Sequence, residues 1–328
     1  MDALIAITYR CNARCQMCSI WRYPTKPSEE IQPKHLRSIP AGLRFANITG
    51  GEPFVRDDVE EFLKVLKEKV KRIVISTNGY FTDKIMRLAK KHSDVGIRIS
   101  IEGLPRANDE LRGLHDGFDR GLRTLLELHQ YGLKDIGFGI TVSDRNILEM
   151  MKLYEMAKMM NLEFATAVVH NTYYFHKFDN NITKVKTLNK ELDQLTTDML
   201  KSKKMKNWFR AYFNYGLKNY VNGGKRLLPC KAGTNLFFVD PFGDLRPCNG
   251  MEITIGNLKI NGFKELWNSK AAEEMRKKVE ECDQNCWMIG SVAPIMRERI
   301  WIPALWIMRH KLQLLWEKKI CMDDIPKR

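Results

Sequence analysis

Residues 11–18 read CNARCQMC, and this short segment decides how the rest of the chain is interpreted. Cys11, Cys15 and Cys18 have the spacing C-x3-C-x2-C, which is improbable by chance in a chain with eight cysteines. No further Cys or His follows directly afterwards. A closed structural zinc site takes four ligands, whereas three thiolates suit a [4Fe-4S] cluster that keeps one iron open. The segment therefore predicts an iron–sulfur site with a position free for chemistry.

The cysteines follow an apolar run, Ala3 to Tyr9, that is typical of a buried strand. Further strand-length apolar runs occupy residues 45–49, 72–77, 95–101, 135–142 and 162–169, with the first strand at 3–8. Helical patterns separate them, which indicates βαβ units and a parallel sheet. The sequence therefore predicts an α/β fold, with the cysteine loop at the strand ends where α/β barrels place their active sites.

Polar motifs follow the next three strands in the same way. They are Thr49-Gly50-Gly51-Glu52-Pro53, then Thr77-Asn78-Gly79, then Ser100, Glu102 and Gly103, with Arg112 beyond them. Each motif alone has an ordinary explanation as a tight turn or a satisfied structural polar group. Taken in order with the cysteine triplet, they make the chain resemble the radical S-adenosylmethionine (SAM) superfamily over roughly residues 1–180.

The resemblance implies a partial (β/α)6 TIM-like barrel and a SAM-binding [4Fe-4S] cluster on Cys11, Cys15 and Cys18. It also implies that the Glu52 carboxylate faces the methionyl ammonium of SAM and that the Arg112 guanidinium faces its carboxylate. The full set of SAM-binding residues that it implies is Met17, Gly50, Gly51, Glu52, Pro53, Asn78, Ser100, Glu102 and Arg112.

A second group of cysteines lies in the C-terminal half. Cys230 and Cys248 flank the apolar run LFFVD and the turn residues 241–244, which predicts a β-hairpin that brings the two thiols together. Cys282 and Cys286 raise the number of thiolates to four. This half resembles the twitch and SPASM auxiliary-cluster domains, which implies one auxiliary [4Fe-4S] cluster. Four thiolates could equally close a structural zinc site.

We expect three parts: a barrel over residues 1–205, a small hairpin-plus-helix auxiliary-cluster domain over 206–293, and a basic, Trp-rich helical tail over 294–328. In the tail, apolar side chains share one helical face among basic residues, which suits either a membrane interface or packing against the barrel. That face carries Trp301, Leu305, Met308, Leu312 and Leu315.

Charge and hydropathy narrow the class of protein. Lys and Arg number 54 against 39 Asp and Glu, a formal net charge of +15, which favours an anionic partner. Hydrophobic residues make up 44% of the chain, which excludes a wholly disordered protein. No apolar stretch of about 18 residues and no signal peptide occurs, so we expect a cytoplasmic protein, with peripheral membrane contact only under the interfacial alternative for the tail.

The resemblance implies a radical SAM oxidoreductase that cleaves SAM reductively to a 5′-deoxyadenosyl radical and removes hydrogen from its substrate. We expect a small-molecule or lipid-linked anionic substrate, such as a sugar derivative, and ferredoxin or flavodoxin as electron donor. The outcome would be oxidation or epimerisation. For these steps the sequence offers His170, after the sixth strand, as an acid/base group and Cys321 as a hydrogen-donating thiol. Two alternatives stay open: a peptide-modifying radical SAM enzyme, and a zinc-containing nucleic-acid-binding protein, although no nucleic acid partner is expected.

Overall fold

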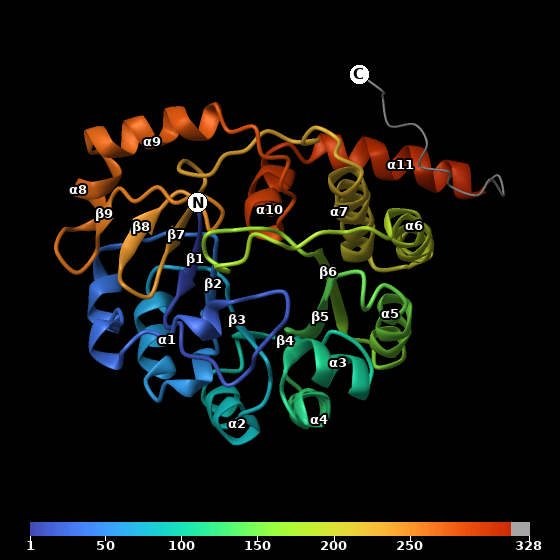
Figure 1. Cartoon of the computed structure of the whole chain (residues 1–328), viewed down its shortest axis with the longest axis horizontal. Helices are drawn as coiled ribbons and strands as arrows, with labels where there is room; N and C mark the ends of the chain where they lie inside the picture. The colour runs from blue at the N-terminus through green and yellow to red at the C-terminus, as the bar shows by residue number, and fades with distance from the viewer. Residues whose placement is uncertain (316–328) are drawn as a thin grey trace.

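The computed structural model describes residues 1–315, and its centre is a nine-stranded sheet in the order β6-β5-β4-β3-β2-β1-β7-β8-β9 (Figure 1). The first six strands are parallel and lie within two residues of their predicted positions, so the predicted partial α/β barrel is confirmed. They are β1 (Asp2–Ala6), β2 (Phe45–Thr49), β3 (Ile73–Thr77), β4 (Gly96–Ser100), β5 (Ile136–Val142) and β6 (Glu163–Val168).

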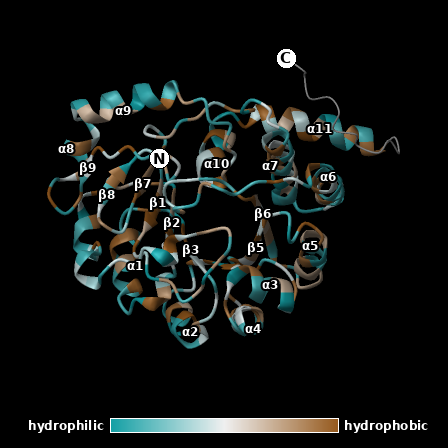
Figure 2. Ribbon diagram, viewed as in Figure 1, coloured by the Kyte–Doolittle hydropathy of each residue, from teal (hydrophilic) through white to brown (hydrophobic). Residues whose placement is uncertain are grey.

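Helices cover the outer face of these strands because each has one apolar face and one polar face. In α1 (Val59–Lys67), for example, Val59, Phe62, Leu63 and Leu66 are buried while the lysines face solvent. Figure 2 shows the same division, with brown strands inside and teal helix surfaces outside. The other barrel helices are α2 (Thr82–Lys91), α3 (Pro105–Arg112), α4 (Gly117–Tyr131), α5 (Glu149–Met159) and α6 (Val185–Lys201). Short 3₁₀ turns occupy Ile20–Arg22, Pro27–Glu29, Pro33–Ser38 and Pro53–Val55.

The C-terminal half extends the same sheet. Strand β7 (Leu236–Val239) pairs in parallel with β1, so that Leu4 lies opposite Phe238. Strand β8 (Asp244–Arg246) then returns antiparallel to β7, which confirms the predicted hairpin, and β9 (Gly256–Asn257) pairs with β8. The sheet is therefore continuous from the barrel into the second half of the chain. The expected domain boundaries stay predictions.

Up to residue 315, five helices accompany this half: α7 (Met205–Val221), α8 (Phe263–Trp267), α9 (Lys270–Glu280), α10 (Ile289–Glu298) and α11 (Trp301–Leu315). Helix α7 packs along α6, and α11 lies across both of them at the outside of the molecule (Figure 1). Within residues 1–315, no helix has the length and apolar character needed to cross a bilayer.

The seam between the two halves is closed by Trp287, a side chain that is only 1% exposed. Its ring lies against Gly216 of α7, and its Nε1–H donates to the carbonyl of Phe213 at 2.9 Å. A methyl group on Gly216 would overlap the Trp287 ring, so glycine at this position lets the indole enter the core.

We expect Gly216→Ala to lower the stability of the protein by about 1–3 kcal/mol, because the added methyl group overpacks the site of a rigid, buried indole. Thermal unfolding of the holoprotein measures the effect. Gly262→Ala is the matched control, since Gly262 has φ −72° and no atom within 4 Å of the added methyl group. Equal melting temperatures for the two variants would contradict the proposed packing.

Candidate active site

The cysteine triplet lies on the loop that leaves β1. Cys11, Cys15 and Cys18 are free and partly exposed thiols, and the backbone N–H of Cys18 donates to the carbonyl of Cys15 at 3.3 Å. Burial raises the pKa of Cys11 and of Cys18 to about 12. Burial therefore disfavours free thiolates at these positions, and a bound cation would be needed to ionise the thiols at neutral pH.

Helix α3 holds this loop in place through Arg112 and Leu111. The carbonyl of Leu111 accepts from the N–H of Gln16 at 2.9 Å. The backbone N–H of Arg14 donates to the carbonyl of Arg112 at 2.8 Å, and the Nη1 of Arg112 donates to the Glu102 carboxylate at 2.9 Å. The Nε of Arg112 and the Nδ2 of Asn12 are buried beside the cysteines and have no acceptor among the described residues. Two unsatisfied donors next to the triplet fit an anionic ligand such as the carboxylate of SAM.

The Gly50-Gly51-Glu52-Pro53 segment runs beside the backbone that leads from β1 to Cys11. The N–H of Gly51 donates to Thr8 and the N–H of Glu52 donates to Arg10, at 2.7 and 2.9 Å. A Cβ on Gly50 would lie 2.6 Å from the Thr8 carbonyl oxygen. The glycines are therefore required here for close contact between two segments of backbone, a reason that the sequence alone did not reveal.

Glu52 is 1% exposed, and its carboxylate already accepts three hydrogen bonds. The donors are the Thr77 hydroxyl at 2.7 Å, the Asn78 N–H at 2.7 Å and the Phe54 N–H at 3.1 Å. This carboxylate thus joins the loops after β2 and β3, in addition to the SAM contact that the sequence predicts for it. The side chain of Asn78 extends the connection by donating to Asn12 Oδ1 at 2.7 Å.

The remaining predicted SAM-binding residues lie at the same edge of the barrel. Ser100 ends β4 and is half-buried, Glu102 follows it and is bonded to Arg112, and Met17 is partly buried within the cysteine loop. The structure therefore brings the predicted residues together at the carboxyl ends of β1 to β4. Their individual roles toward SAM stay predictions.

The second cysteine group converges as the hairpin predicts. Cys230, Cys248, Cys282 and Cys286 line one small cavity of about 20 Å³, together with Arg226. The Nη1 of Arg226 lies 3.4 Å from the Cys286 sulfur, and the N–H of Gly250 donates to the Cys248 sulfur at 3.3 Å. Hydrogen bonds of this kind stabilise sulfurs that carry negative charge, which fits four thiolate ligands around a cluster.

His170 connects the barrel to this second group. Its ring is 6% exposed and stacks on Tyr220, with 4.2 Å between the ring centres. The Nδ1 lies 2.6 Å from the carbonyl of Val168, and the Nε2 accepts from the N–H of Trp287 at 3.1 Å. A carbonyl only accepts and an N–H only donates, so the ring is a neutral Nδ1–H tautomer. Burial also lowers the pKa of His170 to about 4.

Both ring nitrogens of His170 are therefore occupied by backbone partners, and the side chain holds the segment that carries Cys286. The acid/base role suggested by the sequence stays a prediction that this arrangement does not favour. Cys321, the other candidate for a reaction step, lies outside the described residues.

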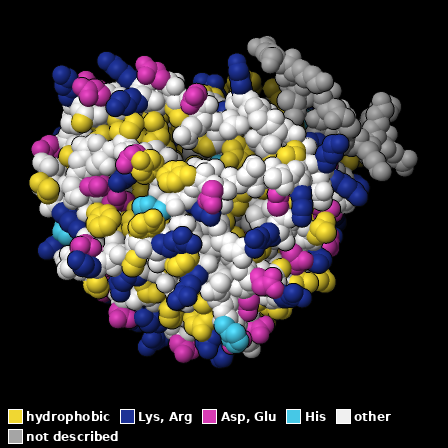
Figure 3. Space-filling model, viewed as in Figure 1, with side chains coloured by type: hydrophobic (Ala, Val, Ile, Leu, Met, Phe, Trp, Pro, Cys, Tyr) yellow, Lys and Arg dark blue, Asp and Glu magenta, His cyan; other side chains and the backbone are white. Residues whose placement is uncertain are grey.

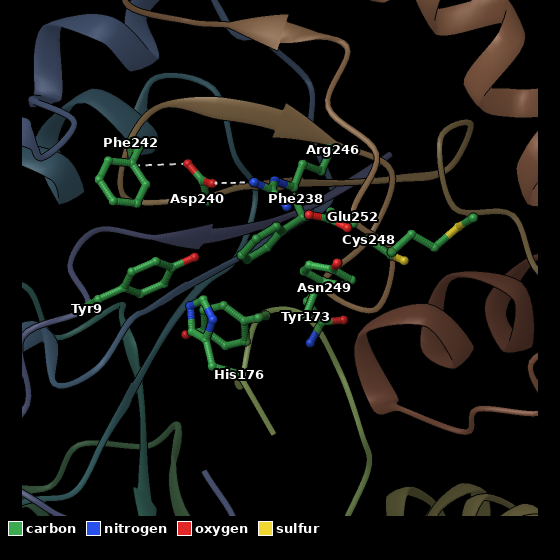
Figure 4. Close-up of a pocket in the computed structure, with 12 residues that line it drawn as sticks. Tyr9, Tyr173, His176, Phe238, Asp240, Phe242, Arg246, Cys248, Asn249 and Glu252 are labelled. Carbon is green, nitrogen blue, oxygen red and sulfur yellow. Dashed lines mark hydrogen bonds and ion pairs between the residues drawn. The ribbon is translucent and has the colours of Figure 1, made fainter. Parts of the chain in front are cut away.

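A cavity of about 180 Å³ lies beside the second cysteine group, with Cys248 in its wall (Figure 4). In Figure 4, Tyr9 and His176 lie on one side of it, and Asp240 and Arg246 lie on the other. The walls come from the start of the cysteine loop, the segment after β6, and the β7–β8 hairpin. The lining residues are Tyr9, Tyr173, Tyr174, His176, Phe238, Asp240, Phe242, Arg246, Cys248, Asn249, Met251 and Glu252.

Asp240 and Arg246 were not identified from the sequence. Asp240 is 1% exposed, and its Oδ1 accepts from the N–H groups of Phe242 and Asp244 at 2.9 and 3.0 Å. Its Oδ2 lies 3.0 Å from the Nη2 of Arg246. Burial raises the pKa of Asp240 to about 6, although the neighbouring guanidinium opposes that shift. The sequence signal is the segment VDPFGDLRPC, residues 239–248. In it Asp240 and Arg246 flank a turn, and the candidate ligand Cys248 follows.

Comparisons with known proteins agree with this architecture. The family model of the radical SAM superfamily matches residues 5–157, and that of an iron–sulfur cluster-binding domain, SPASM, matches residues 230–287. The second match overturns the zinc alternative for the C-terminal cysteines. A radical SAM domain implies SAM and a SAM-binding [4Fe-4S] cluster, and the second domain implies auxiliary iron–sulfur ligation.

Curated relatives are similar at moderate identity. Fe-coproporphyrin III synthase of Methanosarcina barkeri is 30% identical over 158 residues, which cover 46% of this chain and 39% of that protein. AdoMet-dependent heme synthase of the same organism is 24% identical over 85% of both chains. The subtilosin biosynthesis protein AlbA of Bacillus subtilis is 23% identical over 84% of this chain and 61% of its own length.

The solved structure of anSMEcpe with bound AdoMet and a peptide, Cp18Cys, has the same fold. It superposes with a TM-score of 0.64 at 16% identity, over 94% of this chain and 99% of that one. Together these comparisons confirm the expected family, enzyme class and cofactors, while the substrate differs among the similar proteins.

We expect the triple variant C11A/C15A/C18A, and separately the variant C230A/C248A/C282A/C286A, to lose about half of the bound iron, because each group is predicted to hold one [4Fe-4S] cluster of about 4 irons. Iron and sulfide analysis of anaerobically purified protein measures this loss. Only the first variant should also lose the change in the electron paramagnetic resonance spectrum on adding SAM. A full complement of iron in either variant would refute the assignment.

Proposed function

Because this chain is a radical SAM enzyme with a C-terminal iron–sulfur cluster-binding domain, we propose that it oxidises a carbon of a sugar-type substrate bound between its two cysteine groups. The supporting observation is that Cys248 lines both the 180 Å³ cavity and the small cavity of the second cysteine group. The opposite wall includes Tyr9 and Tyr174, which belong to or contact the loop of the first group.

When bound, SAM and the two clusters supply a 5′-deoxyadenosyl radical, which takes one hydrogen atom from the substrate, and an acceptor for one electron. Cys11, Cys15 and Cys18 would hold the first cluster, and the unsatisfied Nε of Arg112 would bind the SAM carboxylate. The remaining proton must go to a protein group. A reductant such as ferredoxin or flavodoxin would supply the electron that starts the reaction.

Aromatic rings and short polar side chains make the cavity suitable for a hydroxylated group. Tyr9, Phe238 and Phe242 offer apolar faces, while Asp240 and Asn249 offer hydrogen-bonding atoms. Two carboxylates and one guanidinium line the cavity, so the cavity itself does not attract a phosphate. We therefore place the sugar inside the cavity and the anionic part of a small or lipid-linked substrate outside it.

Asp240 is the group best placed to accept the proton released during oxidation. It is buried in the cavity wall, and its pKa of about 6 makes it a stronger base than an exposed aspartate while leaving it ionised at neutral pH. Arg246 orients the carboxylate through the 3.0 Å contact with Oδ2. Loss of one hydrogen atom, one electron and this proton completes a two-electron oxidation of an alcohol to a ketone.

A peptide substrate is the second candidate, because the similar proteins include the subtilosin biosynthesis protein and the solved structure with a bound peptide. The main test therefore offers reduced, reconstituted enzyme with SAM to nucleotide sugars, polyprenyl-phosphate sugars and short peptides. Mass spectrometry measures 5′-deoxyadenosine and product. We expect one equivalent of 5′-deoxyadenosine for each sugar that becomes 2 Da lighter, with deuterium transferred from the labelled carbon.

A product of unchanged mass with inverted stereochemistry would show epimerisation instead. Turnover of peptides alone would replace the sugar proposal by the peptide one.

We expect Asp240→Asn to lower product formation about 10²-fold or more, because the amide cannot accept the proton. Formation of 5′-deoxyadenosine should continue and become uncoupled from product. In the unchanged enzyme the rate should rise with pH through about 6, since the ionised carboxylate is the active form, and this rise should vanish in the variant. The amide oxygen can still accept the two backbone hydrogen bonds of the turn.

Asp244→Asn serves as the control, because Asp244 lies on the same hairpin, 3.6 Å from Arg246, but does not line the cavity. Equal losses in both variants would show that the charge balance of the hairpin, rather than proton transfer, limits the reaction.

A further inference from the structure

The outward face of α11 is an apolar stripe on the surface of the enzyme. Five side chains recur three or four residues apart, and each is more than half exposed: Trp301 (60%), Leu305 (55%), Met308 (55%), Leu312 (58%) and Leu315 (78%). Single exposed apolar residues are ordinary, but a continuous row along one helix face marks a surface that binds something. We refer to these five residues as the α11 stripe.

The opposite face of α11 holds the helix rigidly against the protein. Ile307 is 5% exposed, and Trp306 stacks on Tyr215 of α7 with 5.1 Å between the ring centres. Farther along, the Nζ of Lys311 lies 3.9 Å from the Trp208 ring centre and donates to the Leu200 carbonyl at 2.8 Å. The stripe therefore stays outside because the other face already has partners, and no ordering of the helix is needed before it binds.

Basic residues lie near one end of the stripe. Since Trp306 contacts Tyr215 and Lys311 contacts Trp208 and Leu200, the C-terminal half of α11 lies beside the end of α6 and the start of α7. That connection presents Lys201, Lys203 and Lys204, all exposed. The segment from Arg299 to Leu315 contains no acidic residue. Elsewhere on the face seen in Figure 3, Lys and Arg are interspersed with Asp and Glu.

We propose that the α11 stripe and Lys201, Lys203 and Lys204 dock the enzyme on the surface of an anionic lipid bilayer. An exposed apolar helix face next to basic side chains has the two features that interfacial binding requires, which are apolar area to insert and positive charge for lipid headgroups. The helix is about 22 Å long at 1.5 Å per residue, and lies along the protein surface, as an interfacial helix must.

A second copy of the chain is a poorer occupant of the same surface. A two-fold contact would use the same face on both copies and would bring their basic residues together. Helix α11 has no Asp or Glu that could balance that charge. The bilayer proposal does not depend on which substrate the cavity binds, so the two proposals can fail independently.

The test is sedimentation of reconstituted full-length enzyme with vesicles of phosphatidylcholine alone or with about one-third phosphatidylglycerol. We expect binding to the anionic vesicles, at least tenfold weaker binding to the neutral ones, and release at high salt because screening weakens the lysine contribution. The variant L305E/M308E/L312E should lose binding, and K201Q/K203Q/K204Q should weaken it to the anionic vesicles only.

The matched control is L148E/M159E/I260E, which adds the same three negative charges at exposed apolar residues outside α11 (62%, 79% and 82% exposed) and should bind like the unchanged enzyme. Iron content and circular dichroism should be the same in all variants, because every substituted side chain is exposed. Absence of binding to anionic vesicles, or equal losses in the control, would overturn the proposal. So would a dimer, detected by light scattering, that the stripe variant converts to a monomer.

Discussion

Pairing of β1 on both sides is the constraint on which the rest of the structure depends. On one side β1 pairs with β2, whose following loop carries Gly50 to Pro53, and on the other side it pairs with β7, which begins the hairpin next to Cys248. The loop with the cysteine triplet leaves the same strand. One strand therefore fixes the positions of the SAM-binding motifs, the cavity and the second cysteine group relative to one another.

This arrangement places the groups of the proposed reaction around one cavity. One side of the cavity is formed by Tyr9, which precedes the cysteine triplet, and by Tyr174, which lies near Cys18. The other side is formed by the hairpin that carries Asp240 and Arg246. A substrate bound there would be screened from water by rings such as Tyr9 and Phe238, which suits radical chemistry because stray hydrogen donors are kept away. The buried carboxylate supplies the polar function that the aromatic walls lack.

The strands, the hairpin and the convergence of the second cysteine group could be predicted from the sequence, because periodicity and spacing report on local structure. The pairing of β7 with β1 could not, since it joins segments more than two hundred residues apart and no local signal specifies the partner. The same holds for His170, whose two backbone partners, Val168 and Trp287, explain its burial. Gly50 was expected to bind SAM, which stays a prediction, and the structure shows that it lies against the backbone of Thr8.

The seam at Trp287 has a consequence for how the enzyme is assembled. The indole is anchored by Phe213 and Gly216 and its N–H by His170, so the residue next to Cys286 is fixed by packing and hydrogen bonds within the chain. Metal sites whose ligands are already in place need little chain ordering when the metal arrives. The position of Cys286, one of the four expected ligands of the second site, is therefore set by the fold itself rather than by a bound cluster.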